Sequence, residues 1–380
     1  MTRTINPFVV TGKIPTAYFC DRVEESKVLL NALTNQMNVV LTAERRMGKT
    51  SLVDFVFDKP EIKTEYVTIA VDILHTTTFK EFILAFGSAV FDRLATRNDK
   101  LMRLFASTLR SLSASFGYDP VQNSPTFDLK IGDIVNPAYS LGEIFQYLEN
   151  ADTHCLIIID EFQQVTKYPE KNVEALLRTH IQKLQNANFV FSGSQRRIME
   201  EMFFSNKRPF YQSAKSIRLE PIEKAVYCDF AISLFKQGAK NLTADAFEYV
   251  YDIFHGVTLY VQRIMKDAYA ETPKGATCDK ELVKELVERY IAENDERLRE
   301  QMAFISEAQK ELLYAIHAEG KVKSITSAAF IKKHRLKSAS SSQSAALKLL
   351  EYDFITRKEQ IYSISDPLLD LWLSRMNLQL

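Results

Sequence analysis

The sequence feature that most constrains the fold is a strand pattern followed by a short loop and a helix pattern. Residues 37–42 (MNVVLT) predict a buried strand, and residues 50–57 (TSLVDFVF) predict the helix after it. The alternation continues to about residue 220, with strand patterns at 66–74, 154–160 and 188–192 and helix patterns at 79–95, 141–149 and 171–186. Strands that alternate with helices predict an α/β fold with a parallel sheet.

The pattern changes after residue 220, where helix patterns replace the alternation. They cover residues 222–239, 243–254, 257–270 and 279–304, then 306–318, 324–335 and 340–352, and two strand patterns follow at 354–357 and 360–364. Three short helices and a two-stranded ribbon predict a winged helix. We therefore expect a sheet domain over residues 1–220, a helical lid domain over 221–304 and a winged-helix domain over 305–380. A short hairpin is expected around Thr126–Ile131.

The charge and the cysteines narrow the class of protein. Lys plus Arg and Asp plus Glu both number 48, so bulk attraction to nucleic acid is not predicted, although a local basic patch stays open. The cysteines are far apart and form no metal-ligand spacing: Cys20, Cys155, Cys228 and Cys278. With no membrane span and no secretory signal in sight, reduced thiols predict a cytoplasmic protein.

The loop after the first strand, LTAERRMGKTSL, ends as phosphate-binding loops end. Such loops wrap phosphates with backbone N–H groups at a helix N-terminus. In this pattern Gly48 allows a tight turn, Lys49 reaches the β- and γ-phosphates, and Thr50 ligates Mg²⁺. The loop residues expected to bind nucleotide are Ala43, Arg45, Arg46, Met47, Gly48, Lys49, Thr50 and Ser51.

The usual loop pattern, G-x-x-x-x-G-K-[ST], begins with a glycine, and Ala43 stands in its place. Two outcomes are open. At a negative φ, alanine costs little. At a positive φ it costs about 1 kcal/mol, which distorts the loop without removing a phosphate contact.

A second motif, LIIIDE, places Asp160 and Glu161 at the carboxyl end of a buried strand. Ligands bind at this edge of a parallel sheet. Asp160 is expected to hold Mg²⁺ through water, and Glu161 to orient or deprotonate the attacking water. The alternative is a lone strand that ends in two exposed acids. No [NT]-K-x-D guanine motif is present, which favours adenine.

The strand after that ends in SGSQ (192–195), whose polar tip is expected near the γ-phosphate. Ser194 is either a sensor of that phosphate or part of a plain turn. Together with Lys49 and Glu161, it completes the set of expected catalytic residues.

These residues resemble the archaeal-type ATPases of the STAND branch of P-loop NTPases, relatives of the AAA+ and Orc/Cdc6 proteins. The resemblance covers nearly the whole chain. The family motif h-h-G-R-E-x-E corresponds to FCDRVEE (19–25), G-P-R-R-x-G-K-T-S to AERRMGKTS (43–51), and D-P-x-x-x-x-W to DPLLDLW (366–372). The resemblance implies an AAA+-like sheet, a helical lid and a winged helix, with Arg22 binding on the adenine side of the nucleotide.

The chain departs from the family pattern at several positions. Asp21 replaces the glycine of the adenine-side motif, and Val23 replaces its first glutamate. Ala43 and Glu44 replace Gly-Pro in the loop, and Thr258 replaces a lid proline. These changes concern nucleotide affinity and exchange, and they remove no catalytic group.

The resemblance implies that ATP and ADP are the ligands, that Mg²⁺ is required, and that slow hydrolysis resets a nucleotide-driven switch. The alternative is a DNA-binding regulatory or mobile-element-associated module in which nucleotide is mainly structural. A third hypothesis is a scaffold that has lost nucleotide binding. The third winged-helix helix, 340–352, would read DNA, and Lys332, Lys333 and Arg335 supply local positive charge. Contacts with an unidentified protein partner are the other use of such a domain, and the oligomeric state is left open.

Overall fold

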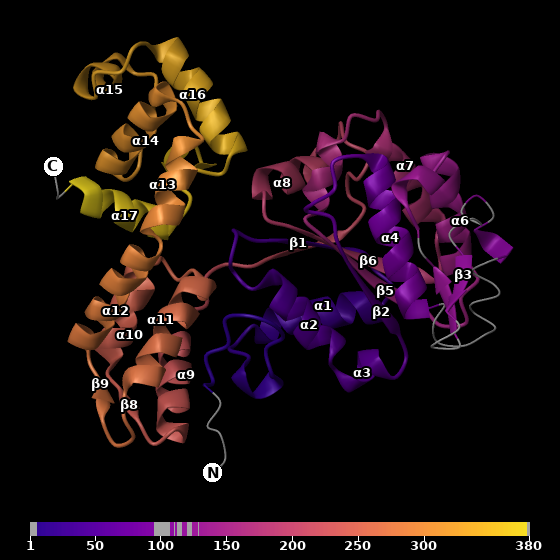
Figure 1. The fold of residues 1–380 in the computed structure, drawn as a ribbon, viewed down its shortest axis with the longest axis horizontal. Coiled ribbons are helices and arrows are strands. Elements are labelled where there is room, and N and C mark those ends of the chain that lie inside the picture. Colours follow the sequence, from indigo (N-terminus) through magenta and orange to yellow (C-terminus); the bar gives the residue numbers. More distant parts are fainter. Residues whose placement is uncertain are drawn as a thin grey trace. The chain divides into compact units, whose positions relative to one another are not determined.

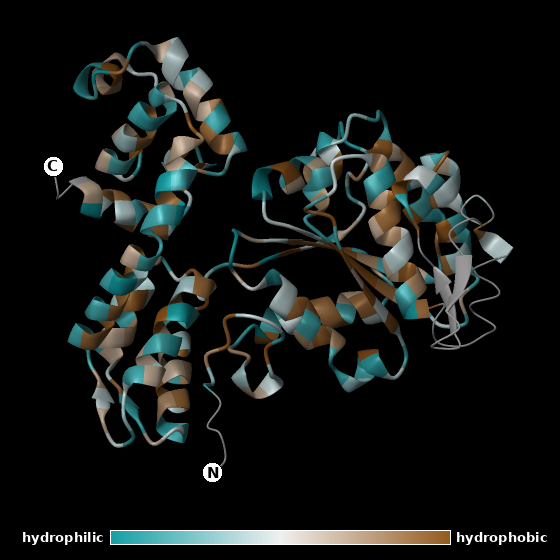
Figure 2. Cartoon of the chain, viewed as in Figure 1, coloured by the Kyte–Doolittle hydropathy of each residue, from teal (hydrophilic) through white to brown (hydrophobic). Residues whose placement is uncertain are grey.

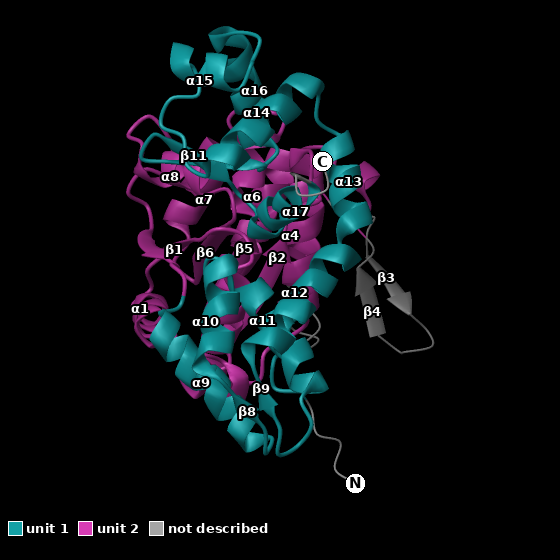
Figure 3. Ribbon diagram, turned by 90° about the vertical axis from the view of Figure 1, so that its left-hand side faces the viewer, with its two compact units in different colours: residues 1–10, 222–380 teal, residues 11–221 magenta. Residues whose placement is uncertain are grey.

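The computed structural model describes residues 6–94, 107–109, 111, 116–119, 124–127 and 129–377. The chain divides into two compact units. One contains Thr11–Pro221, and the other combines the residues up to Val10 with those from Ile222 onward (Figure 3). The chain therefore passes between the units twice.

The unit Thr11–Pro221 is built on a five-stranded sheet. Its strands are β1 (Val39–Thr42), β2 (Val67–Asp72), β5 (Cys155–Asp160), β6 (Ala187–Gly193) and β7 (Lys215–Arg218). They pair in the order β2-β5-β6-β1-β7, and every pair is parallel (Figure 1). The predicted parallel α/β sheet is confirmed.

The central strands are apolar because helices cover both faces of the sheet. Every residue of β6 is buried, and in β5 only the final Asp160 is partly exposed. Hydropathy colouring shows the central strands as largely hydrophobic (Figure 2). The edge strand β7 was missed by the sequence analysis, because its four residues, KSIR, include a single apolar side chain and show no strand pattern.

Helices pack on both faces of this sheet. One face is covered by α1 (Val23–Thr34), α2 (Lys49–Phe57) and α3 (Pro60–Lys63), and the other by α4 (Phe79–Leu94), α6 (Pro137–Glu149), α7 (Val173–Lys183) and α8 (Arg196–Phe204). Side chains such as Phe86, Ile144 and Phe189 form the core under the second group. Burying each of them stabilises the fold by about 1.5–3 kcal/mol. No helix among the described residues is long and apolar enough to span a membrane.

A hairpin was predicted around Thr126–Ile131, but the structure has it at earlier residues. The antiparallel pair is β3 (Phe116–Asp119) with β4 (Ser124–Phe127). Residues Ile131–Asp133 form a 3-10 helix, in which the Asp133 carboxylate accepts the Lys130 backbone N–H at 3.0 Å. This local hydrogen bond favours a turn where the sequence analysis expected a strand.

The second unit begins with a group of helices. They are α9 (Lys224–Gln237), α10 (Ala244–Ile253), α11 (Thr258–Glu271), α12 (Lys280–Glu293) and α13 (Asp295–Ala303), with short paired strands β8 (Asn241–Leu242) and β9 (Thr277–Cys278). The prediction of a single helix over 279–304 is wrong, because α12 ends at Asn294 and α13 follows. The backbone of Asn294 leaves the helical region, and its side-chain amide donates to the Tyr290 carbonyl at 2.8 Å.

The C-terminal part of this unit is a winged helix, as predicted. Its elements are α14 (Glu307–Glu319), α15 (Ala328–Lys333), α16 (Ala339–Glu351), β10 (Ile355–Lys358), β11 (Ile361–Ile364) and α17 (Pro367–Asn377). The wing turns through Glu359 and Gln360, which have φ of 46° and 69° as a two-residue hairpin turn requires. Val322 bridges to Tyr362 and extends the ribbon.

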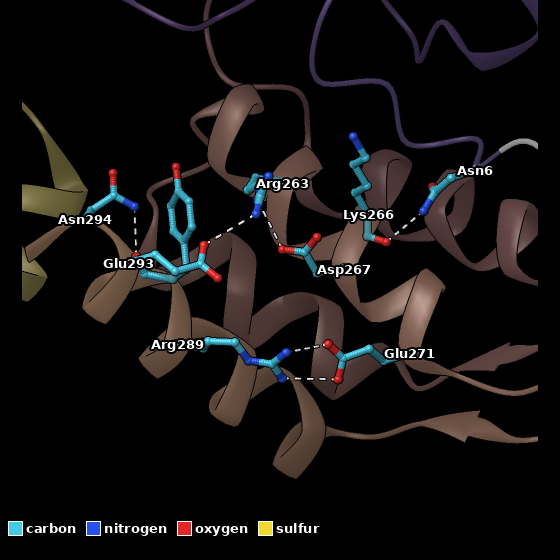
Figure 4. A network of polar contacts seen from close by, with 9 residues as sticks. Asn6, Arg263, Lys266, Asp267, Glu271, Arg289, Glu293 and Asn294 are labelled. Carbon is cyan, nitrogen blue, oxygen red and sulfur yellow. Dashed lines mark hydrogen bonds and ion pairs between the residues drawn. The ribbon is translucent and has the colours of Figure 1, made fainter.

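Residues 6–10 belong to the second unit, although the predicted sheet domain began at residue 1. The Phe8 ring lies 5.7 Å from that of Phe235 and 6.0 Å from that of Tyr269, and Phe8 is 1% exposed. Asn6 donates from its amide to the Lys266 carbonyl at 2.8 Å (Figure 4). Burial of a large aromatic ring decides the boundary, and sequence patterns do not report it.

Ion pairs join the helices of the second unit (Figure 4). Arg263 in α11 lies 3.1 Å from Asp267 and 3.4 Å from Glu293 of α12. Arg289 of α12 contacts both oxygens of Glu271, at 2.6 and 3.1 Å. The pairs Arg263–Glu293 and Arg289–Glu271 link α11 to α12, whereas the pair Arg263–Asp267 lies within α11.

Candidate nucleotide-binding site

The loop between β1 and α2 has the backbone of a phosphate loop. Gly48 precedes α2 with φ of 86°, a conformation that favours glycine. Nothing lies within 4 Å of where its Cβ would be, so a side chain would not clash there. The positive φ of the backbone is the reason that glycine is favoured at this position. The only other left-handed residue of the loop is Arg46, with φ of 68°.

Ala43 is not left-handed, which decides between the two outcomes left open by the sequence. It lies at the end of β1 and is 1% exposed. Alanine therefore costs little at this position. Loss of the first glycine does not strain the loop.

The structure brings the two motifs together. Lys49 is the first residue of α2 and is 8% exposed. The next residue, Thr50, donates from Oγ1 to Oδ2 of Asp160 at 3.0 Å. The end of the phosphate loop thus contacts the end of strand β5, 110 residues later in the chain.

The edge of the sheet that carries these residues holds the carboxyl ends of all five strands. Asp72 pairs in register with Asp160, and Thr42 pairs with Gly193. Because the strands are parallel, their polar ends gather at one edge. The alternative of a lone strand ending in two unconnected acids does not hold.

Glu161 is held by its neighbours. Its φ is 56°, and its backbone N–H donates to Oδ1 of Asp160 at 3.0 Å. Its Oε2 accepts hydrogen bonds from Oγ of Ser194, at 2.6 Å, and from Nε2 of Gln163. The structure therefore brings Ser194 to Glu161. The sequence analysis missed Gln163. The only signal in the sequence was its position two residues after Glu161.

The fit of a divalent cation can be judged from the oxygens present. Thr50 and Asp160 offer hard oxygen ligands, which Mg²⁺ prefers. Burial raises the pKa of Asp54 in α2, and the charges of Asp58 and Asp160 raise it further against the opposing effect of Lys13. The charges of Asp54 and Asp160 therefore interact. No group of three or more His, Cys, Asp or Glu side chains forms a metal site within the described part of the chain.

Arg22 occupies a buried position before α1. It is 5% exposed, and its Nη1 lies 2.9 Å from Glu25. Its Nη2 and the Oγ of Ser26 are buried and have no hydrogen-bond partner among the described residues. Asp21 and Arg22 both have positive φ, 55° and 59°. Glycine suits the first of these positions, and aspartate is among the residues that tolerate it best.

The other predicted residues are placed as follows. Met47 is buried, Ser51 is half-buried, and Arg45 and Arg46 are exposed. Thr258 is the first residue of α11, a position that favours proline. Gly256, two residues earlier, has φ of 70°.

Comparison with known families agrees with this geometry. Residues 19–264 match the family described as an ATPase domain predominantly from Archaea. The chain belongs to this archaeal-type ATPase family. Residues 296–375 match a family described as a "probable winged helix domain". Nucleotide binding and ATPase activity follow in general terms from membership of the ATPase family.

Solved structures share the fold of this ATPase over its whole length. A Walker-type ATPase of Pyrococcus abyssi is 17% identical with a TM-score of 0.68, covering 97% of this chain and 99% of that one. The ORC2 protein of Aeropyrum pernix, solved as ADPNP–ADP complexes, is 13% identical with a TM-score of 0.58 and 98% of both chains covered. The ORC1 protein of the same organism, solved with DNA, is 14% identical with a TM-score of 0.52 and 95% of both covered.

At such identities the likeness shows the fold alone. A comparison with curated proteins finds no match. The predicted P-loop ATPase fold with a C-terminal winged helix is confirmed. Assignment to the STAND branch stays a prediction.

Proposed function

We propose that this ATPase binds ATP with Mg²⁺, hydrolyses it slowly, and uses the nucleotide state to change the relation between its two units. The observation that supports this most is the hydrogen bond from Thr50 to Asp160, with Glu161 as the next residue. One site then contains a phosphate-binding loop, two oxygen ligands for a cation and a carboxylate for water. These are the groups that phosphoryl transfer requires.

Phosphate binding would come from the start of α2. Its first backbone N–H groups have no partner within the helix, and the helix dipole favours an anion there. Lys49 stands at the first position of α2, so its ammonium would offset charge that develops on the β- and γ-phosphates. Arg22, with a buried and unpartnered nitrogen, would bind on the adenine side.

The chemical step would depend on Glu161 and Ser194. Glu161 would orient the attacking water or accept its proton. Ser194 holds one oxygen of that carboxylate at 2.6 Å. Thr50 would ligate Mg²⁺ directly and Asp160 would hold it through water. The cation supplies charge neutralisation at the phosphates.

Slow turnover is part of this proposal. An arginine that neutralises the transition-state charge accelerates hydrolysis in P-loop proteins by about 10³–10⁵-fold. The proposal assigns no arginine to that role, so we expect turnover on the order of 10⁻⁴ to 10⁻² per second.

The switch is supported by the division of the chain into two units joined at two points. We propose that residues 221–304 are a lid domain and that residues 305–380 are the winged-helix domain. A switch requires that the γ-phosphate interact differently with two arrangements of these units. We place the protein in the cytoplasm, because its four cysteines are buried and none of them forms a disulfide within the described residues.

The test is phosphate release by wild type, Lys49→Ala and Glu161→Gln, together with the nucleotide content of the purified protein. We expect ADP to co-purify, and Glu161→Gln to bind ATP while losing at least about 100-fold in release. Lys49→Ala should lose both ATP binding and phosphate release. The control is Lys183→Ala, which removes an exposed lysine at the end of α7. Release that persists in Lys49→Ala would refute the proposal.

A second candidate function is DNA binding by the winged helix. Several basic residues of this domain are exposed: Lys332, Lys333, Arg335, Lys337, Lys348, Arg357 and Lys358. The exposed start of α16 offers Ser340, Gln343 and Ser344 as hydrogen-bonding groups. A protein of this fold has been solved with DNA.

Opposing charges weaken this candidate. Glu319 pairs with Lys333, and Glu351 lies 2.7 Å from Lys348. Binding to duplex DNA measured at several salt concentrations, with and without ATP, decides between the candidates. Tight, salt-dependent binding that ignores nucleotide would favour the DNA module, with the salt slope reduced by about 1 in Arg335→Ala.

A further inference from the structure

A buried glutamine lies beside the proposed catalytic acid. Gln163 is 1% exposed, and its Nε2 donates to Oε2 of Glu161. Oγ of Ser194 donates to the same oxygen at 2.6 Å. Among the residues that the structure describes, Oε1 of Glu161 accepts no hydrogen bond. One carboxylate oxygen is therefore held twice and the other is left for a further donor.

The backbone around Gln163 is fixed by packing. The left-handed Glu161 turns the chain, and Phe162 then enters an aromatic cluster, 4.6 Å from the ring of Phe191 and 5.2 Å from that of Phe210. Oγ1 of Thr166 donates to the Gln163 carbonyl at 2.8 Å. The side chain of Gln163 starts from a rigid position.

The space for the glutamine side chain depends on Gly193. A Cβ at this position would collide with Oε1 of Gln163 and would lie 2.6 Å from Cγ and Sδ of Met199. Gly193 ends β6, directly before Ser194. The absence of a side chain at Gly193 thus leaves space for the Gln163 amide. The next residue in the chain is Ser194, the other donor to Glu161.

Packing alone does not account for a glutamine in this slot. Its Oε1 is buried and has no hydrogen-bond partner among the described residues. A buried polar atom without a partner destabilises the fold, so an apolar side chain of similar length would suit stability better. Polar groups that oppose stability are typical of functional sites.

We propose that Gln163 is a positioning residue: with Ser194 it holds Oε2 of Glu161, so that Oε1 is oriented to accept from the attacking water. This inference rests on the proposed ATPase function and adds to it the group that aims the acid. Two donors on one oxygen remove the rotation that a single hydrogen bond would leave. Misplacing a catalytic group by about 1 Å can lower a rate by about 10²-fold.

The first test replaces the amide by an apolar side chain of similar length, Gln163→Met. We expect kcat for ATP to fall by about 10- to 100-fold while KM changes less than twofold, because the loss affects the reacting water and not nucleotide binding. The matched control is Gln164→Met, since that amide donates at 3.0 Å to the Thr76 carbonyl and not to the acid. An unchanged or increased kcat in Gln163→Met would overturn the proposal.

The second test asks whether Gln163 acts through Glu161. In a Glu161→Ala background, Gln163→Met should change the residual release by less than twofold, and a further loss would contradict the proposal. The same two substitutions should also shift the unfolding temperature non-additively, whereas additive shifts would overturn it. Thermal unfolding needs no turnover. If phosphate release does not depend on Lys49, the proposed ATPase function is refuted. Non-additive shifts of the unfolding temperature in that case would still confirm the hydrogen bond between Gln163 and Glu161. Ser194→Ala provides a second variant that frees the same oxygen if Gln163→Met does not fold.

Discussion

The hydroxyl of Tyr260 donates a 2.6 Å hydrogen bond to Oδ1 of Asp366. Tyr260 is a buried residue of helix α11, and Asp366 also accepts from the Leu368 N–H at the start of α17. Six residues later, Nε1 of Trp372 donates to Asp295 of α13 at 2.8 Å. The two end residues of the D-P-x-x-x-x-W motif therefore join this C-terminal segment to α11 and α13.

Removing the Tyr260 hydroxyl should loosen this joint. A hydrogen bond to a charged group contributes about 1.5–3 kcal/mol, so Tyr260→Phe should lower the protection of α17 amides by about that free energy. Hydrogen exchange of the full chain measures it, and the strands of the sheet should be unaffected. The control is Tyr352→Phe, because Tyr352 is an exposed tyrosine of the winged helix. Unchanged exchange in α17 would show that the hydrogen bond does not hold the joint.

Positions 43 and 48 of the phosphate loop should differ in their sensitivity to substitution. Ala43 is not left-handed, so Ala43→Gly should change ATP affinity less than twofold. Gly48 has φ of 86° and open space around its Cβ position, so Gly48→Ala should weaken ATP binding through backbone strain of about 1 kcal/mol, roughly fivefold. Calorimetric titration with ATP compares the two. A large gain in Ala43→Gly would mean that the alanine is a defect.

The ion pair of Arg208 and Glu174 should make stability depend on pH. Burial raises the pKa of Glu174, and Arg208, with 2.7 Å between Nη2 and Oε1, opposes that rise. Because the raised pKa disfavours the charged form in the folded chain, the penalty is absent at acid pH and grows as pH rises. Removing the arginine increases the penalty.

Arg208→Met should therefore destabilise the chain by about 2 kcal/mol at pH 7.5 and by less at pH 5. Chemical denaturation of the variant and of wild type at both values gives the difference. The double variant with Glu174→Gln should recover part of the loss and lose the pH dependence. A loss that is equal at both pH values would mean that Glu174 remains protonated.

The cysteines should be unreactive in the folded chain. Burial raises the pKa of Cys20 to about 12 and that of Cys278 to about 11, and it also raises the pKa of Cys228. At pH 8 only about one part in 10³ of Cys278 is thiolate, the reactive form. Ellman's reagent should modify these thiols only after denaturation, and rapid modification of the native chain would contradict their burial.

Sequence patterns were sufficient for the parts of the site that have local signals. The apolar strand before Asp160 and the glycine before Lys49 are readable from neighbouring residues, and the fold places them together. The positive φ of Asp21 and the hydrogen bond from Gln163 to Glu161 are seen only in the structure. Neither residue belongs to a sequence pattern that predicts these features.

The same reasoning explains the misplaced elements. The helix break at Asn294 depends on a side-chain hydrogen bond, and residues 6–10 are assigned by the burial of Phe8. The β7 strand is too short and too polar to be recognised. Only the placement of residues 6–10 rests on a tertiary contact, whereas the break at Asn294 is local and β7 lacks a strand pattern.

The central claim is that nucleotide state changes the relation between the two units. Small-angle scattering of Glu161→Gln, saturated with ATP and Mg²⁺ and then with ADP and Mg²⁺, tests it most directly, because this variant should hold ATP without hydrolysing it. We expect two different scattering profiles for Glu161→Gln, and a single profile for Lys49→Ala under both conditions. Identical profiles in Glu161→Gln, with occupancy of each nucleotide verified, would contradict it.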